Sequence, residues 1–359
     1  MNTYNLTDSY PIDYDFIAHI HSKEFQFPSE AFEILYKNGM FELPRFRQTS
    51  GHNEGHGNET QIILNDLIAI GSGDLAVGRI YEGHINALLL IDVYGTLEQK
   101  QRYFDDAANG KIFGIWNTER SFEAVTYKEV SEGIEFEGAK TFCSGSLNIS
   151  RPIITASGPE GKKMFVLEME HFKDLQEDTS LWKPLGMEAT VSHRIDFTNC
   201  KVLSRQVLGI AGDYDKNPYL SYGAIRFAAV LLGCAHAIAK ITLKHLKKLE
   251  RESNASQNLR ISELGILLQN GHFWFQHCPD LVEGKKCLSQ VNYANMLRTD
   301  ISRICELILS IAEKAIGVQG MLKPHPFERK FRDLKVYLKQ PNPDLALESI
   351  GHYYAQYGF

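Results

Sequence analysis

The sequence lacks the segments that direct a chain into or across a membrane. Its first fifteen residues, MNTYNLTDSYPIDYD, contain no basic segment and no apolar core of the length that a signal peptide needs. Elsewhere no uninterrupted apolar run is long enough to cross a bilayer. We therefore expect neither secretion nor membrane insertion, and a cytoplasmic location.

Patterned cysteine and excess positive charge are also missing. The six cysteines are scattered without the spacing of a disulfide framework or a metal site, which indicates reduced thiols. His52 and His56 stand close together, but without further ligands they predict a solvated loop and no metal site. The net charge of -6 argues against nucleic acid as a partner.

What is present is an ordinary globular composition, with 43% hydrophobic and 23% charged residues. A chain of 359 residues exceeds the size that one hydrophobic core usually supports, so several packed units are expected. Helical patterns on both sides of a central β-rich stretch divide the chain into residues 1–108, 109–213 and 214–359. This order predicts an α+β protein.

In the first zone, apolar residues recur at helical spacing. Apolar faces cover residues 31–36, 62–68 and 85–93, and each predicts a helix. Thr96 and Gln99 have the spacing of a capping box, in which each side chain satisfies a free backbone amide of the other. A further short helix is therefore expected directly after Thr96.

The second zone consists of short runs rich in β-branched and aromatic residues, separated by Gly, Pro, Asn and Asp. These runs cover residues 112–116, 133–136, 152–157, 163–169 and 192–197. The stretch GIEFEGAK, residues 133–140, alternates in character across two faces and predicts one half-buried strand. A small sheet or barrel follows from this pattern.

The third zone returns to long helices with apolar residues three and four positions apart. They are expected over residues 225–249, 258–275 and 288–317. A charged helical stretch that starts at Glu328 then meets Pro341-Asn342-Pro343, which a helix cannot cross. A second helical pattern begins at Asp344.

Several local strings, in this order and spacing, resemble the acyl-CoA dehydrogenase flavoprotein superfamily over nearly the whole chain. They are GTLEQK at 95–100, GIWNTE at 114–119, GAKTFCS at 138–144, LGMEAT at 185–190, Arg226 with Gly233, ER at 328–329 and RD at 332–333. The resemblance implies an N-terminal helical domain, a central β-barrel and a C-terminal four-helix bundle. It also implies a homodimer or homotetramer that binds FAD, with FMN as the alternative.

The resemblance places the flavin between barrel and bundle and assigns residues to it one at a time. The residues it implies are Trp116, Asn117, Thr118, Phe142, Cys143 and Ser144 at the flavin ring, and Gly317 and Gln319 at the adenine end. Phe142 stands where the family has a tryptophan, and the alternative for it is an ordinary core aromatic. The turn 120–124 departs from the family because it contains no glycine.

The catalytic base of the family is missing. Dehydrogenation of an acyl thioester needs a carboxylate that removes the α proton while the flavin accepts hydride from the β carbon. The two positions where the family places this glutamate are Pro341 and Ile225 here. Glu119, Glu123 and Asp92 are weak candidates for a substitute, since structurally paired acids are far commoner. No catalytic residue is therefore assigned.

Three functions remain open at this point. The first is an acyl-CoA dehydrogenase-like oxidoreductase of unknown substrate, with an acyl-CoA among the candidates. The second is a flavin-dependent monooxygenase, because the proline break and added C-terminal helix resemble that branch, although Tyr337 and Lys339 stand where histidine is common. The third is a non-catalytic flavoprotein or scaffold. A flavin reductase or an electron-transfer protein is the expected redox partner of an active enzyme.

Overall fold

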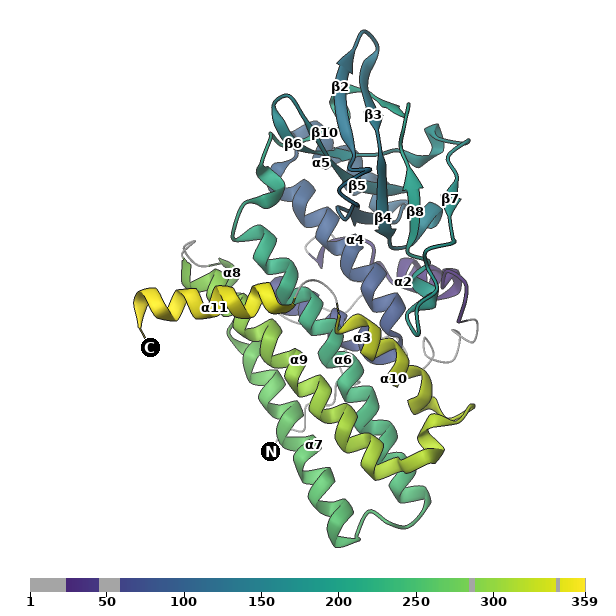
Figure 1. The fold of residues 1–359 in the computed structure, drawn as a ribbon, viewed down its shortest axis with the longest axis vertical. Coiled ribbons are helices and arrows are strands. Elements are labelled where there is room, and N and C mark those ends of the chain that lie inside the picture. The colour runs from purple at the N-terminus through teal and green to yellow at the C-terminus, as the bar shows by residue number, and fades with distance from the viewer. Residues whose placement is uncertain (1–23, 45–58, 284–287, 340–342, 359) are drawn as a thin grey trace.

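The computed structural model describes residues 24–44, 59–283, 288–339 and 343–358. Strands gather at one end of the molecule and long helices form the other end, with α4 running between them (Figure 1). The α+β fold class expected from the sequence is confirmed, because helices precede and follow a region of short strands. His52 and His56 lie outside the described residues.

Four helices are described before the first strand, and they cover the stretches where the sequence predicts helices. They are α2 (Ser29–Lys37), α3 (Glu59–Gly73), α4 (Leu75–Tyr94) and α5 (Leu97–Ala108). The predicted capping box is present, since the Thr96 side chain accepts the Gln99 N–H and the Gln99 side chain accepts the Thr96 N–H. Asp74 caps α4 by accepting the N–H groups of Ala76 and Val77.

Ten strands in the described residues form two sheets. They are β1 (Phe113–Trp116), β2 (Thr126–Val130), β3 (Gly133–Glu137), β4 (Ala139–Cys143), β5 (Arg151–Gly158), β6 (Gly161–Val166), β7 (Glu177–Asp178), β8 (His193–Asp196), β9 (Lys201–Val202) and β10 (Val207–Leu208). The larger sheet has the order β10-β6-β5-β2-β3-β9, with β1 paired in parallel to β5, and the smaller has the order β4-β8-β7.

The prediction of one strand over residues 133–140 is wrong. Gly138 has a φ of +110°, which only glycine adopts readily, and it divides the stretch into β3 and β4. β3 pairs with β2 in the larger sheet, whereas β4 pairs with β8 in the smaller one. The chain therefore changes sheets at Gly138, where an added Cβ would lie 2.5 Å from the Ala124 carbonyl oxygen.

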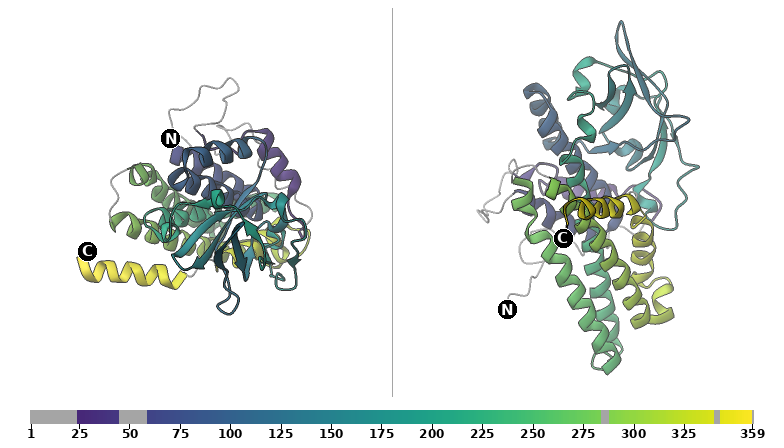
Figure 2. Two further views of the ribbon diagram at one scale, coloured as in Figure 1. Left: turned by 90° about the horizontal axis from the view of Figure 1, so that it is seen from above. Right: turned by 60° about the vertical axis from the view of Figure 1, so that its left-hand side comes forward.

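The C-terminal half is built from helices α6 (Tyr219–Lys248), α7 (Ala255–Gln276), α8 (Cys278–Glu283), α9 (Leu288–Ile316), α10 (Pro326–Tyr337) and α11 (Pro343–Tyr357). The expected helix stop is present, since α10 ends at Tyr337 and α11 begins at Pro343. Pro341 and Asn342 themselves lie outside the described residues. Figure 2 shows α11 extending away from the rest of the molecule.

Helices α3 and α6 cross with their backbones almost in contact. A Cβ on Gly233 would lie 2.0 Å from the carbonyl oxygen of Ile68, and one on Gly71 would lie 2.4 Å from that of Val230. Glycine is thus required on both helices at the crossing. The apolar core of the helical region is built around this contact, with Leu231 and Leu232 fully buried.

Helix α6 has the length and composition of a membrane-spanning helix, with a mean hydropathy of 1.6 over its most apolar stretch. Some 67% of that stretch is buried inside the protein, as in the core helix of a globular domain. Its apolar character is therefore explained by the packing of α3, α6 and α9.

Candidate flavin site

The segments that follow β1 and end β4 lie side by side and carry most of the predicted flavin residues. The Thr141 N–H donates to the Thr118 carbonyl at 2.9 Å, and the Trp116 Nε1–H donates to the Ser144 carbonyl at 3.1 Å. Trp116 is itself buried, so its indole holds the two segments together. Thr118 is exposed beside them.

Phe142 is an exposed aromatic in an unfavourable backbone conformation. Its side chain is 52% exposed and its φ is +55°, a value that bulky residues rarely adopt. The ring forms a T-shaped pair with that of Trp182, with the ring centroids 6.1 Å apart. The interpretation of Phe142 as an ordinary core aromatic is therefore wrong. Strained backbone of this kind is found most often at binding and catalytic sites.

Cys143 and Ser144 differ in what they can offer to a ligand. The Cys143 side chain is fully buried, and this burial raises the pKa of its thiol well above the usual range. Its side chain thus faces the protein interior, so only its backbone can reach a ligand. Ser144 is partly exposed, and its hydroxyl lies 3.0 Å from that of Ser192, which in turn contacts the Thr190 hydroxyl at 2.7 Å.

Lys140, which the sequence did not single out, organises the interior of this site. Its side chain is fully buried, and its ammonium donates to the Asn117 carbonyl at 3.1 Å and to the Thr155 hydroxyl at 3.0 Å. It also forms an ion pair with Glu119. Burial lowers the pKa of Lys140, whereas the Glu119 carboxylate opposes that shift. The backbone of residues 117–119 is thus held by a buried cation.

Gly317 and Gln319 lie apart from this group. Both are exposed in the short 3-10 helix η7 (Gly317–Met321), which joins the end of α9 to α10. That end of α9 is the one farther from the strands (Figure 1). One chain therefore brings Trp116, Thr118 and Ser144 together, but it does not bring Gly317 or Gln319 to them.

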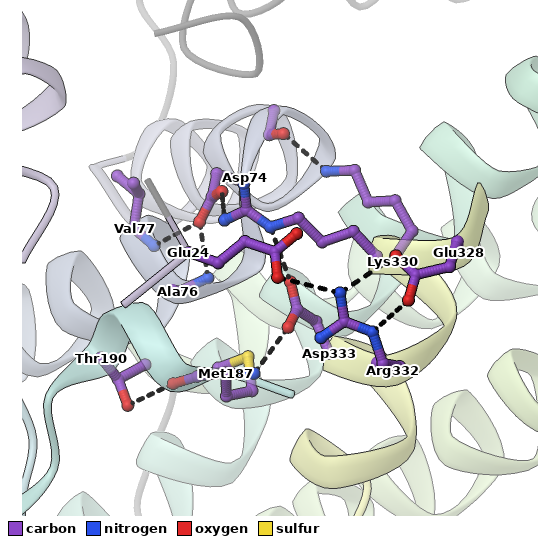
Figure 3. Close-up of polar contacts among 12 residues, drawn as sticks. Glu24, Asp74, Ala76, Val77, Met187, Thr190, Glu328, Lys330, Arg332 and Asp333 are labelled. Atoms are coloured by element: carbon purple, nitrogen blue, oxygen red, sulfur yellow. Dashed lines mark hydrogen bonds and ion pairs between the residues drawn. The ribbon is translucent and has the colours of Figure 1, made fainter. Parts of the chain in front are cut away.

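The family-like pairs Glu328-Arg329 and Arg332-Asp333 form a charge network between α10, α4 and the strand region (Figure 3). Arg329 pairs with Asp74 at 2.7 Å, so it binds the same carboxylate that caps α4. Arg332 pairs with Glu328 on its own helix and with Glu24. The network fixes α10 against the start of α4.

Asp333 links α10 to the segment between β7 and β8. Its carboxylate accepts the Met187 N–H at 2.5 Å, and a Cβ on the preceding Gly186 would lie 2.4 Å from the Arg332 backbone. Burial, together with the nearby Asp74 carboxylate, raises the pKa of Asp333 to about 6. The segments LGMEAT (185–190) and RD (332–333), which are far apart in the sequence, thus contact each other.

The carboxylates considered as substitute bases have structural partners or lie elsewhere. Glu119 pairs with Lys140, and Glu123 pairs with Arg194 at 2.8 Å. Asp92 lines a cavity among the helices. Ile225 is buried and apolar, so this family position offers no proton acceptor.

Two other residues have packing roles. His84 is buried, and it contacts the Phe41 carbonyl through Nε2 at 2.8 Å and accepts the Phe113 N–H through Nδ1 at 3.0 Å. Tyr337 is buried against the edge of Phe227. Both side chains are therefore part of the protein interior.

No protein-family model matches the sequence. Among curated proteins, the chain is 22% identical over 305 residues to mitochondrial isobutyryl-CoA dehydrogenase of Dictyostelium discoideum, covering 79% of this chain and 72% of that protein. It is 24% identical over 341 residues to dibenzothiophene monooxygenase of Mycolicibacterium goodii, covering 84% and 82%. Dehydrogenases and monooxygenases are thus matched at similar levels of identity.

The similar solved structures also include both a monooxygenase and a dehydrogenase. The complex of TdsC from Paenibacillus sp. A11-2 with FMN and indole superposes with a TM-score of 0.84 at 16% identity, covering 96% of each chain. Butyryl-CoA dehydrogenase from Megasphaera elsdenii gives a TM-score of 0.81 at 17% identity, covering 99% of each chain. The fold is therefore the acyl-CoA dehydrogenase fold, as the sequence strings predicted.

Proposed function

We propose that this chain, which has the fold and the relatives of the acyl-CoA dehydrogenase superfamily, is a flavin-dependent oxidoreductase. The observation that carries the proposal is Phe142, which exposes its ring beside Thr118 and Ser144 at the cost of a positive φ. An exposed ring with neighbouring hydroxyls suits a planar heteroaromatic group, which needs a stacking surface and hydrogen-bond donors.

Each residue of the site then has a task that follows from its contacts. A bound flavin supplies the acceptance or delivery of hydride or electrons. Phe142 offers an apolar surface, and Thr118 and Ser144 offer hydroxyl groups. Trp116 keeps the two segments in register through its bond to the Ser144 carbonyl. Lys140 keeps residues 117–119 in place from inside.

Within this proposal, monooxygenation fits better than thioester dehydrogenation. Ile225 cannot accept a proton, and Glu119 is committed to Lys140. A hydroxylating enzyme does not require a carboxylate at either family position. A flavin reductase would then supply reduced flavin, whereas an electron-transfer protein is the partner expected for dehydrogenation.

We also propose that the chain assembles as a homo-oligomer through α7. Leu259, Ile266 and Phe273 are exposed by 69%, 61% and 52%, and they stand seven residues apart on one helix. Seven residues are close to two helical turns, so the three side chains form a stripe. In such an assembly a neighbouring copy could bring its Gly317 and Gln319 to the flavin.

Flavin binding is the decisive measurement. The purified protein is expected to show flavin absorption, or to acquire it on titration with FAD or FMN. Phe142→Ala should weaken binding about tenfold because a stacking surface is lost. Phe25→Ala removes another exposed ring, which is 72% exposed and lies elsewhere, and should leave flavin binding unchanged. A colourless protein that binds neither flavin would overturn the proposal and favour the scaffold function.

Dehydrogenation and monooxygenation can be distinguished by experiment once flavin is bound. Anaerobic mixing with a panel of acyl-CoA thioesters should leave the oxidised absorption unchanged, because neither family position of the base carries a carboxylate. With a flavin reductase and oxygen, oxygenated product from an aromatic panel is the expected result. Bleaching by a thioester would instead select dehydrogenation.

A further inference from the structure

Helices α6 and α7 run side by side (Figure 1) and bring two histidine side chains into direct contact. His236 of α6 and His272 of α7 have their Nε2 atoms 2.7 Å apart and their ring centroids 4.8 Å apart. Both residues are partly exposed, so solvent reaches the pair. Neither residue belongs to the candidate flavin site.

The contact follows from how the two helices pack. Leu232 stands four residues before His236, on the same face of α6. A Cβ on Gly271, which precedes His272, would lie 2.7 Å from Leu232 Cδ1. Glycine therefore lets the backbone of α7 come close to α6 at this level, and the two imidazoles meet about one turn further along α6.

The protonation state of the pair suits a metal ion. Burial, with a further contribution from His272, lowers the pKa of His236 to about 3, and burial also lowers the pKa of His272. Both rings are therefore neutral at pH 7. A neutral imidazole has one N–H and one lone pair, so one Nε2 donates to the other in this contact. Moving that proton to Nδ1 of the same ring presents two Nε2 lone pairs without a change of charge.

The distance between the two nitrogens is close to the one that a bound metal ion needs. Zn²⁺ holds histidine nitrogens at about 2.0–2.1 Å, which puts two of them about 3.3 Å apart at a tetrahedral angle. The pair therefore has to open by about 0.6 Å, a change that small rotations of two side chains provide. No group of three or more ligating side chains forms a metal site in the described part of the chain, so water would complete the coordination.

A second histidine pair, at the start of α10, has the opposite arrangement. His325 has its Nε2 3.2 Å from Nδ1 of His245, and its own Nδ1 accepts the Phe327 N–H as the cap of α10. Its Nε2 must therefore carry the proton, and it offers no lone pair to a metal unless the cap is lost. Burial, together with the charges of Lys248 and Arg251, lowers the pKa of His245, and the same charges repel a metal cation.

We propose that His236 and His272 bind a divalent transition-metal ion of the zinc type, which links α7 to α6. Neutral imidazole is a preferred ligand of Zn²⁺, Ni²⁺ and Cu²⁺. Helix α7 has little buried surface of its own, since Leu264, Gly271 and Phe275 are the buried residues among its 22. An ion that binds only the packed pair of helices adds to the attachment of α7. The site does not depend on the proposed function, because neither histidine contributes to flavin binding.

The test is a titration of the metal-free, full-length protein with Zn²⁺, measured by calorimetry and by urea unfolding. One ion per chain is expected to bind and to raise the urea midpoint, because it binds the folded state. His236→Gln and His272→Gln should each weaken Zn²⁺ binding at least about tenfold, since glutamine is polar but has no imidazole. Unfolding of each variant without metal shows that it has kept its fold.

His245→Gln is the matched control, because it removes one histidine from the pair that does not suit a metal. This variant should retain both the affinity for Zn²⁺ and the shift of the urea midpoint. Undiminished affinity in either His236→Gln or His272→Gln, or an equal loss in His245→Gln, would show adventitious binding at other histidines and overturn the inference. A wild-type protein that does not bind Zn²⁺ would overturn it as well.

Discussion

At the scale of single residues, Lys140 determines how the candidate flavin site is held. A fully buried ammonium is stable only when its three protons have acceptors, and here they meet a carbonyl, a hydroxyl and a carboxylate. Two of the three acceptors, the Asn117 carbonyl and the Glu119 carboxylate, flank Thr118 in the chain. The geometry of the exposed residues therefore depends on a side chain that no ligand touches.

Lys140→Met is expected to destabilise the protein by about 3 kcal/mol, because it leaves the Glu119 carboxylate without its cation. Adding Glu119→Gln should recover part of that loss, since the unpaired charge is removed. Urea unfolding of the wild type, the single variant and the double variant measures both effects. Equal stability of the single and double variants would show that the ion pair does not carry the effect.

Asp333 predicts a pH dependence of stability. Its pKa in the folded protein is raised to about 6, so the folded state holds this proton more tightly than the unfolded state. Its favourable contribution is complete below about pH 4 and is lost as the pH rises through about 6, on the order of 2–3 kcal/mol. The wild type should therefore lose stability relative to Asp333→Asn as the pH rises from about 4 to about 7. A difference that stays constant would contradict the raised pKa.

At the scale of elements, helix periodicity was the reliable signal and strand continuity was not. The helices α3, α4, α6 and α9 follow from apolar spacing, because each buries one face in the core. The break at Gly138 could not be predicted, since residues 133–140 alternate in character and only the backbone shows that β3 and β4 belong to different sheets. The burial of Lys140 was missed for a similar reason, because lysine in a strand is usually exposed.

The crossing of α3 and α6 gives a test at this scale. Gly233→Ala places a methyl group 2.0 Å from the Ile68 carbonyl oxygen, so the helices must separate, and a loss of about 3 kcal/mol is expected. Gly223→Ala on the same helix meets nothing within 4 Å and should be neutral or stabilising by up to about 1 kcal/mol. Thermal unfolding of both variants checks the contrast. Similar losses in the two would show that the crossing is not the cause.

At the scale of the whole molecule, the residues predicted to bind the flavin lie in two separate regions. Trp116, Thr118, Phe142 and Ser144 were predicted from local strings and lie together, whereas Gly317 is at the far end of the bundle. Sequence strings carry no information on which copy of a chain supplies a residue. This part of the assignment therefore depends on assembly.

The assembly prediction is tested on α7. Ile266→Glu puts a charge in the middle of the exposed stripe and should shift the protein toward a smaller species in light scattering, because an apolar interface does not accommodate an unpaired charge. Leu97→Glu changes an apolar residue that is 86% exposed on α5 and should leave the mass unchanged. A wild-type chain that is already a monomer at micromolar concentration would contradict the proposal.

The glycine contact between α3 and α6 also bears on the width of the cavity among α3, α4, α6 and α8, although neither Gly71 nor Gly233 lines that cavity. Two straight helices that touch at one point separate with distance from it, and the cavity beside Arg226 begins about two turns of α3 away from Gly71. We therefore expect a displacement at the contact point to change the distance between α3 and α6 at the cavity. The dimensions of this cavity can thus change through Gly71 and Gly233, which do not line it.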